Sequence, residues 1–254
     1  MNRSIAFNTI VSREIRRFVR IWPQTILPPV ITTSLYFLIF GTLIGTRIGP
    51  MDGRPYMEYI VPGIILMSVI SNAYGNVVSS FYSTKFQRHI EEMLIAPVPN
   101  WVILFGYVSG GVVRGVTVGL VVALISCLFT RLSVMHYAIS LSILVLTAML
   151  FSLAGFINAT FANSFDDISI IPNFVLTPLT YLGGVFYSIH LLPEIWQKIS
   201  LANPILYMVN AFRYGVIGVS DIQIGLAFLI IALFNGVLIL VSLFLLHRGV
   251  GIKI

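Results

Sequence analysis

The sequence predicts an all-α integral membrane protein, and two observations support this. Hydrophobic residues make up 57% of the 254 residues and charged residues only 9%, against about a quarter charged in ordinary soluble domains. Several apolar runs also reach the roughly 20 residues that a helix needs to cross a bilayer. One cysteine and four scattered histidines offer no disulfide framework and no metal-ligand spacing. We therefore expect no bound metal. Because no polybasic or aromatic-basic surface is left outside these runs, we also expect no nucleic-acid partner.

Six apolar runs are expected to cross the membrane within one domain, residues 1–254. An even number places both termini on one side. Cytoplasmic segments carry an excess of Lys and Arg, and the termini with the 82–101 loop hold nine of these residues against five on the other side. We therefore expect both termini in the cytoplasm. The predicted spans are about 24–45, 59–81, 102–129, 134–161, 168–189 and 223–246.

Residues 4–22 are predicted to form an amphipathic helix in the cytoplasmic interface. Four arginines recur at i, i+3, i+4 and i+7, opposite an aliphatic and aromatic face. Such a helix would direct its arginines toward lipid phosphates, whereas a plain basic tail that only sets orientation is the alternative. Pro23 and the Pro28-Pro29 pair predict a turn into a kinked first span. The arginines are Arg13, Arg16, Arg17 and Arg20.

Residues 84–99 concentrate charge in a chain that otherwise uses little of it. A helix from about 84 to 96 would separate an apolar face from a charged one, with Arg88 three and four positions before two glutamates. The chain has no G-x-x-x-x-G-K-[ST] loop for ATP, so we interpret this helix as a docking element; a solvated connector is the alternative. The residues expected to dock are Lys85, Phe86, Arg88, Ile90, Glu91, Glu92, Leu94 and Pro97.

Polar and aromatic residues in the second and fifth spans are candidates to line a translocation path. Hydrogen bonds between helices and packing at the membrane interface are the alternatives. Residues 190–222 carry charges that a full span would accommodate poorly, so we expect two short helices that dip back from the outer surface, with a seventh span at 204–222 as the alternative. The candidates for lining are Asn72, Asn76, Thr180, Tyr181 and Phe186.

The third span contains glycines spaced four residues apart, which let helix backbones approach closely. They are Gly106 and Gly110, and Gly111, Gly115 and Gly119. Packing within the chain and contact between subunits are both open. Arg114, in the same span, is expected to have a structural partner, with a water-filled vestibule as the alternative. Asp167 is expected to cap the fifth span, where the helix dipole favours an anion.

Three polar-containing blocks then indicate a family. The chain contains FQRHIEEMLIAPVP, FDDIS and TPLTYLGGVFYS in this order, and it resembles the type-2 permease subunits of bacterial ABC exporters over essentially its whole length. The resemblance implies the type-2 ABC exporter fold, a homodimer of permeases and two copies of an ABC ATPase subunit. It also implies that 84–99 is the coupling helix, that 4–22 can border the ATPase, and that Asp166-Asp167 could form a second contact.

We therefore expect a non-catalytic permease of the bacterial inner membrane that exports a lipid, a glycan or an amphipathic drug. It should bind no cofactor itself, with ATP and Mg on the partner ATPase. A gradient-driven carrier or channel is the alternative, although no acidic residue or histidine lies near the middle of a span to bind a coupling ion. A membrane-embedded enzyme would need a catalytic constellation that the sequence does not contain.

Overall fold

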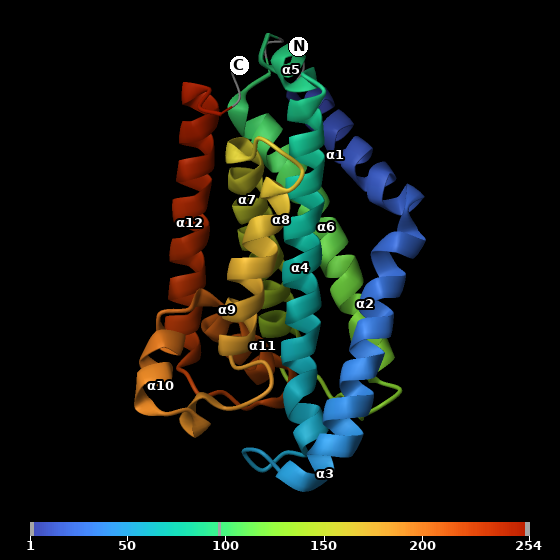
Figure 1. Ribbon diagram of the computed structural model, residues 1–254, viewed down its shortest axis with the longest axis vertical. Coiled ribbons are helices and arrows are strands. Elements are labelled where there is room, and N and C mark those ends of the chain that lie inside the picture. Colours follow the sequence, from blue (N-terminus) through green and yellow to red (C-terminus); the bar gives the residue numbers. More distant parts are fainter. Residues whose placement is uncertain (1–2, 96–97, 252–254) are drawn as a thin grey trace.

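The computed structural model describes residues 3–95 and 98–251, and this part of the chain is a bundle of helices without strands. Figure 1 shows the start of the first helix, the end of the last helix and α5 (His89–Ile95) at one end of the bundle, which we call the terminal end. The other, or distal, end carries α3 (Gly45–Ile48) and α10 (Glu194–Leu201). This arrangement agrees with the prediction that both termini lie on one side of the membrane.

Three long helices form the centre of the bundle. They are α4 (Tyr56–Phe86), α6 (Asn100–Ser126) and α7 (Tyr137–Phe161). The 31 residues of α4 correspond to a length of about 46 Å, whereas the hydrocarbon core of a bilayer is about 30 Å thick. Because α4 is longer than the membrane is thick, at least one of its ends must extend beyond the hydrocarbon.

Helices at the edge of the bundle expose apolar side chains. At the N-terminus, α1 (Arg3–Arg20) meets α2 (Trp22–Tyr36) at an angle, and Pro23 lies in the first turn of α2, as the predicted turn requires. A π-helical run, η1 (Phe37–Ile44), continues α2 to α3. At the C-terminus, α12 (Ile224–Arg248) runs alongside the bundle. Only 17% of the apolar stretch in Trp22–Gly41, which runs from α2 into η1, and 28% of the apolar stretch in α12 are buried within the bundle. Lipid or another chain must therefore cover these surfaces.

Five helical segments in the described part of the chain are long and apolar enough to cross a membrane, and they correspond to five of the six predicted spans. The predicted span at 168–189 is shorter. It consists of α8 (Asp167–Ile171), the π-helical η2 (Pro172–Leu176) and α9 (Thr177–Leu182), of five, five and six residues. The helix ends before Gly183 and Gly184, and a loop follows, so a sixth full span stays a prediction.

Two short helices at the distal end precede α12, as predicted for residues 190–222. After α10, α11 (Pro204–Ile217) begins with Asn203, whose side chain accepts a hydrogen bond from the backbone N–H of Ile205, and ends at Gly218 in the left-handed conformation. Its 14 residues correspond to about 21 Å, which is too short to span a bilayer. The alternative of a seventh span is therefore wrong, and α11 is a short helix packed within the distal end.

Arg213 on α11 is fully buried, although the sequence places it among the charges of the outer surface. Its guanidinium carbon lies 3.9 Å from the ring centroid of Tyr59, and an Nη donates to the backbone carbonyl of Gly184. A second Nη lies 3.5 Å from Oδ1 of Asn210. Arg213 thus connects α11 to α4 and to the loop after α9.

The glycines of α6 provide close packing within the chain. A Cβ at Gly106 would lie 2.6 Å from Cγ2 of Ile10, and one at Gly110 would lie 2.5 Å from Cβ of Glu14, both on α1. A Cβ at Gly111 would lie 2.5 Å from Val77 on α4. The first glycine pair therefore admits α1 and the later series admits α4, so intrachain packing explains both.

Candidate functional site

The buried side of α1 carries a carboxylate. Ile10, Glu14 and Phe18 recur every four residues and face the bundle, and Glu14 is only 1% exposed. The glycines of α6 let this helix approach closely enough to bury the group. A buried carboxylate must be paired and hydrogen-bonded to be tolerated, so its partners define the site.

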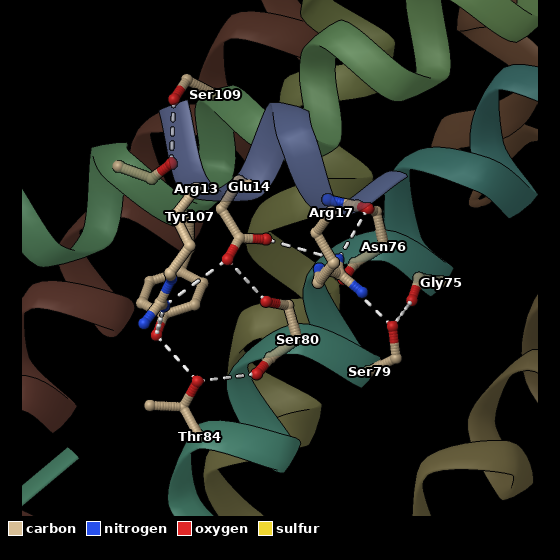
Figure 2. Close-up of polar contacts among 11 residues, drawn as sticks. Arg13, Glu14, Arg17, Gly75, Asn76, Ser79, Ser80, Thr84, Tyr107 and Ser109 are labelled. Atoms are coloured by element: carbon tan, nitrogen blue, oxygen red, sulfur yellow. Dashed lines mark hydrogen bonds and ion pairs between the residues drawn. The ribbon is translucent and has the colours of Figure 1, made fainter. Parts of the chain in front are cut away.

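Figure 2 shows those partners at the junction of α1, α4 and α6. The hydroxyl of Ser80 donates to Oε1 of Glu14 at 2.7 Å. Nη2 of Arg17 lies 3.3 Å from Oε2 of Glu14, and Nη2 of Arg13 lies 3.5 Å from its Oε1. Arg17 also donates to Asn76, at 2.8 Å to Oδ1 and 2.9 Å to the backbone carbonyl. We call this set of residues the Glu14 cluster.

The Glu14 cluster continues through Tyr107 to the end of α4. Nη2 of Arg13 donates to the Tyr107 hydroxyl at 2.6 Å, and that hydroxyl donates to Oγ1 of Thr84 at 2.9 Å. Thr84 lies two residues before the end of α4. A continuous polar network thus joins α1, α6 and the terminal end of α4.

This network corrects part of the prediction for residues 4–22. Arg16 and Arg20 are exposed and remain free to meet lipid phosphates. In contrast, Arg13 and Arg17 bond to the bundle. Sequence reasoning missed Glu14, although one signal was present: an acid occurs four residues after Ile10 and four before Phe18, on an otherwise apolar face.

A groove of about 970 Å³ lies against the Glu14 cluster, between α1 and the end of α4. Its walls include four of the five arginines of α1, all but Arg3, together with Gln87 in the turn after α4 and His89 at the start of α5. The basic side chains outnumber the single carboxylate, so the groove is positively charged. Such a groove attracts acidic groups of a protein or a lipid.

The predicted coupling helix is divided in two. Lys85 and Phe86 belong to α4, the chain turns at Gln87 and Arg88, and α5 runs only from His89 to Ile95. Arg88 has a φ of 61°, a left-handed conformation that ends a helix. A single helix from 84 to 96 is therefore wrong, and no ion pair joins Arg88 to Glu91 or Glu92 among the described residues.

The predicted docking residues fall into two groups. Ile90 is 1% exposed and packs into the core, whereas Phe86 and Ile95 are 64% and 85% exposed. Arg88 and Glu92 are also exposed, and Glu91 is half-buried. The side chain of Leu94 and the whole of Pro97 lie outside the described residues. The exposed set therefore mixes both charges with two large apolar side chains.

Lys85 ties α4 to α7. Its Nζ donates to the backbone carbonyls of Thr160 and Ala162, each at 2.8 Å. Thr160 lies in the last turn of α7, where carbonyls lack donors within the helix, and Ala162 directly follows that helix. Nearby, the ring of Phe86 lies 5.3 Å from that of Phe165. Lys85 thus has a structural role, and α5 follows directly from the place where α4 and α7 are joined.

Asp167 is the first residue of α8 and bonds back to the turn that precedes this helix. Its carboxylate accepts hydrogen bonds from the backbone N–H groups of Asn163 and Ser164, at 2.8 and 3.1 Å. Its own N–H donates to Oγ of Ser164. Ser164 and Asp167 thus bond reciprocally, as in a capping box, and Asp167 places its carboxylate at the N-terminus of α8, as expected.

The candidates for a translocation path are separated. Asn76 is fully buried and bonded to Arg17, and Thr180 is buried and donates to the carbonyl of Leu176, at the end of η2. Tyr181 and Phe186 join an aromatic cluster with Phe40, in which the rings of Phe40 and Phe186 stack 4.9 Å apart. Asn72 lines a cavity, which is described below with Arg114.

Comparison with known proteins agrees with this architecture. Residues 5–217 match the family described as ABC-2 type transporter. The chain is 55% identical over 249 residues to the inner membrane transport permease YadH of Escherichia coli K12, covering 98% of this chain and 97% of the relative. It is also 24% identical over 219 residues to nodulation protein J of Rhizobium leguminosarum bv. viciae, covering 84% and 83%. This chain therefore belongs to the ABC-2 type transporter family, as a multi-pass membrane permease subunit.

Proposed function

We propose that the chain exports its substrate across the bacterial inner membrane, driven by a separate ABC ATPase that docks on α5 and the groove beside α1. The functional unit in this proposal is a homodimer of permeases with two ATPase copies, and the terminal end faces the cytoplasm. ATP and Mg bind to the ATPase, and this chain holds no cofactor. A lipid, a glycan or an amphipathic drug is the class of substrate.

One observation carries the proposal: α5 is attached to a junction of four helices. Lys85 joins α4 to α7, and the Glu14 cluster joins α4 to α1 and α6. A force applied to α5 would therefore reach all four helices together, since interfaces of this kind move as packed units. This is the property that a coupling element needs.

The exposed surface of α5 and of the turn before it suits a protein partner. Phe86 and Ile95 offer apolar area, and Arg88 and Glu92 offer charges of both signs. Large apolar side chains within a polar surround are typical of protein interfaces. The groove beside α1 adds a positively charged surface for an acidic patch of the same ATPase.

The test is association with, and ATP hydrolysis by, a candidate ABC ATPase subunit from the same organism. The permease and ATPase are purified together and reconstituted in liposomes, with Arg88→Glu and Glu92→Arg as charge reversals. We expect each reversal to weaken association by about tenfold, because like charges are brought together at an interface. Arg131→Glu, in the exposed loop between α6 and α7, is the matched control. Unchanged association and hydrolysis in both charge reversals would show that α5 and the turn before it are not the coupling element.

A further inference from the structure

A second cavity lies between α2, α4 and α6, away from the groove beside α1. Its volume is about 360 Å³, the volume of about a dozen water molecules. It is large enough for a small polar group but not for a whole lipid. Gln24 and Ser71 line it and are exposed, so the cavity is accessible from outside the bundle.

The wall of this cavity carries one cation and no carboxylate among the described residues. The cation is Arg114, about midway along α6. A guanidinium has five N–H donors. Among the described residues, Arg114 makes one hydrogen bond, from its Nε to Oδ1 of Asn72 at 3.4 Å, which is long. A charged side chain at this depth is costly without an anionic partner.

Neighbouring charges do not compensate Arg114. One helical turn along α4 from Asn72, Asn76 bonds to Arg17 of the Glu14 cluster. Glu14 already pairs with both Arg13 and Arg17, so its single negative charge does not balance the charge of Arg114. The charge on Arg17 repels that on Arg114 and adds to the positive potential in the cavity.

The surface beside the cavity is suited to a hydrocarbon chain. Pro28, Pro29 and Thr32 of α2 line the cavity, while Leu27 and Ile31 on the same helix are 49% and 56% exposed. An anionic group could therefore enter the cavity while an attached apolar tail stays against α2 in the lipid. The polar groups of Gln24 and Thr32 add donors on the same wall.

We propose that this cavity binds the phosphate or carboxylate headgroup of an amphiphilic transport substrate, with Arg114 as its counter-ion. The inference rests on the proposed export function and narrows its substrate class to amphiphiles with an anionic headgroup. Asn72 positions Arg114 and leaves the remaining guanidinium donors for the ligand.

The test measures binding to the permease alone, so that it does not depend on the ATPase. The full chain in phosphatidylcholine nanodiscs is titrated with oleoyl lysophosphatidic acid or with monoolein, which has the same tail but no phosphate. Binding is measured by native mass spectrometry after release of the protein from the nanodiscs. Oleic acid provides the carboxylate. We expect the two anionic probes to bind about tenfold more tightly than monoolein, since a hydrogen-bonded charge contributes on that scale.

Two variants test the role of Arg114. Arg114→Gln removes the charge, and Asn72→Asp introduces a carboxylate of the same shape beside the guanidinium, which keeps the protein testable if the first variant does not fold. In both, the preference for the anionic probes should fall to within about twofold. Arg131→Gln removes an exposed arginine elsewhere and should keep the full preference.

The outcomes separate the parts of the proposal. A preference that persists in Asn72→Asp overturns it, as does an unmodified chain that binds monoolein equally well. Competition by inorganic phosphate at millimolar concentration would assign the site to a free anion and overturn the amphiphile assignment, whereas its absence supports it. Failure of the ATPase to associate would refute the proposed function and leave these binding results unaffected.

Discussion

Replacing Glu14 with glutamine should loosen α1 from the bundle. The substitution keeps the shape of the side chain but removes the charge that faces Arg13 and Arg17. At a separation of about 3.4 Å and an effective dielectric constant near 20, each charge pair amounts to about 5 kcal/mol before the cost of burying the carboxylate. The arginine side chains are 44% and 32% exposed, so water replaces part of this interaction. We therefore expect a net loss of about 1–2 kcal/mol.

The assay is thermal unfolding of the purified permease in neutral detergent. A loss of 1–2 kcal/mol should lower the Tm by roughly 2–8 °C for a chain of this size. Glu194→Gln, an exposed glutamate on α10, should leave the Tm unchanged. A double-mutant cycle with Ser80→Ala should show coupling, since Ser80 donates to the same carboxylate. An unchanged Tm together with no coupling would refute the assignment of Glu14 as the anchor of α1.

Three other substitutions test the junction and the distal end by the same thermal assay. Gly110→Leu should lower the free energy of unfolding by about 1–3 kcal/mol, because its Cβ would lie 2.5 Å from Glu14. Gly236→Ala, where a Cβ would meet nothing within 4 Å, should not lower it. Equal effects of the two substitutions would exclude close packing as the cause. Lys85→Met should lower the free energy of unfolding by about 1–2 kcal/mol, because the carbonyls of Thr160 and Ala162 lose their donor. An unchanged Tm would mean that these hydrogen bonds do not stabilise the fold. Arg213→Met should lower the free energy of unfolding by about 2–4 kcal/mol, because the carbonyl of Gly184 loses its charged donor. A variant with a higher Tm would contradict this structural role of Arg213.

The sequence predicted the helices well where long apolar runs define them. Their length and low charge place α4, α6, α7 and α12 close to the expected spans. Short helices at 190–222 were also predicted, because Pro204 and the charged residues disfavour a span. These features depend on residues that are near one another in the chain.

Features that depend on distant partners could not be predicted in the same way. Arg17 meets Asn76, 59 residues away, and the Arg stripe of α1 alone fits a lipid surface equally well. Arg213 is buried because Tyr59 and the carbonyl of Gly184 accept it, and neither is its neighbour in sequence. The break at Arg88 had no local signal, since no glycine, proline or asparagine marks the left-handed residue.

The most direct test of the central claim is a cross-link between α5 and the ABC ATPase. The exposed native Cys127 is first replaced by serine, and Glu92→Cys is then combined with single cysteines over the surface of the ATPase. The account predicts rapid disulfide formation at one ATPase surface from Glu92→Cys and none from Glu194→Cys at the distal end. No cross-link from α5, or equal cross-linking from both positions, would contradict the claim that the ATPase docks on α5.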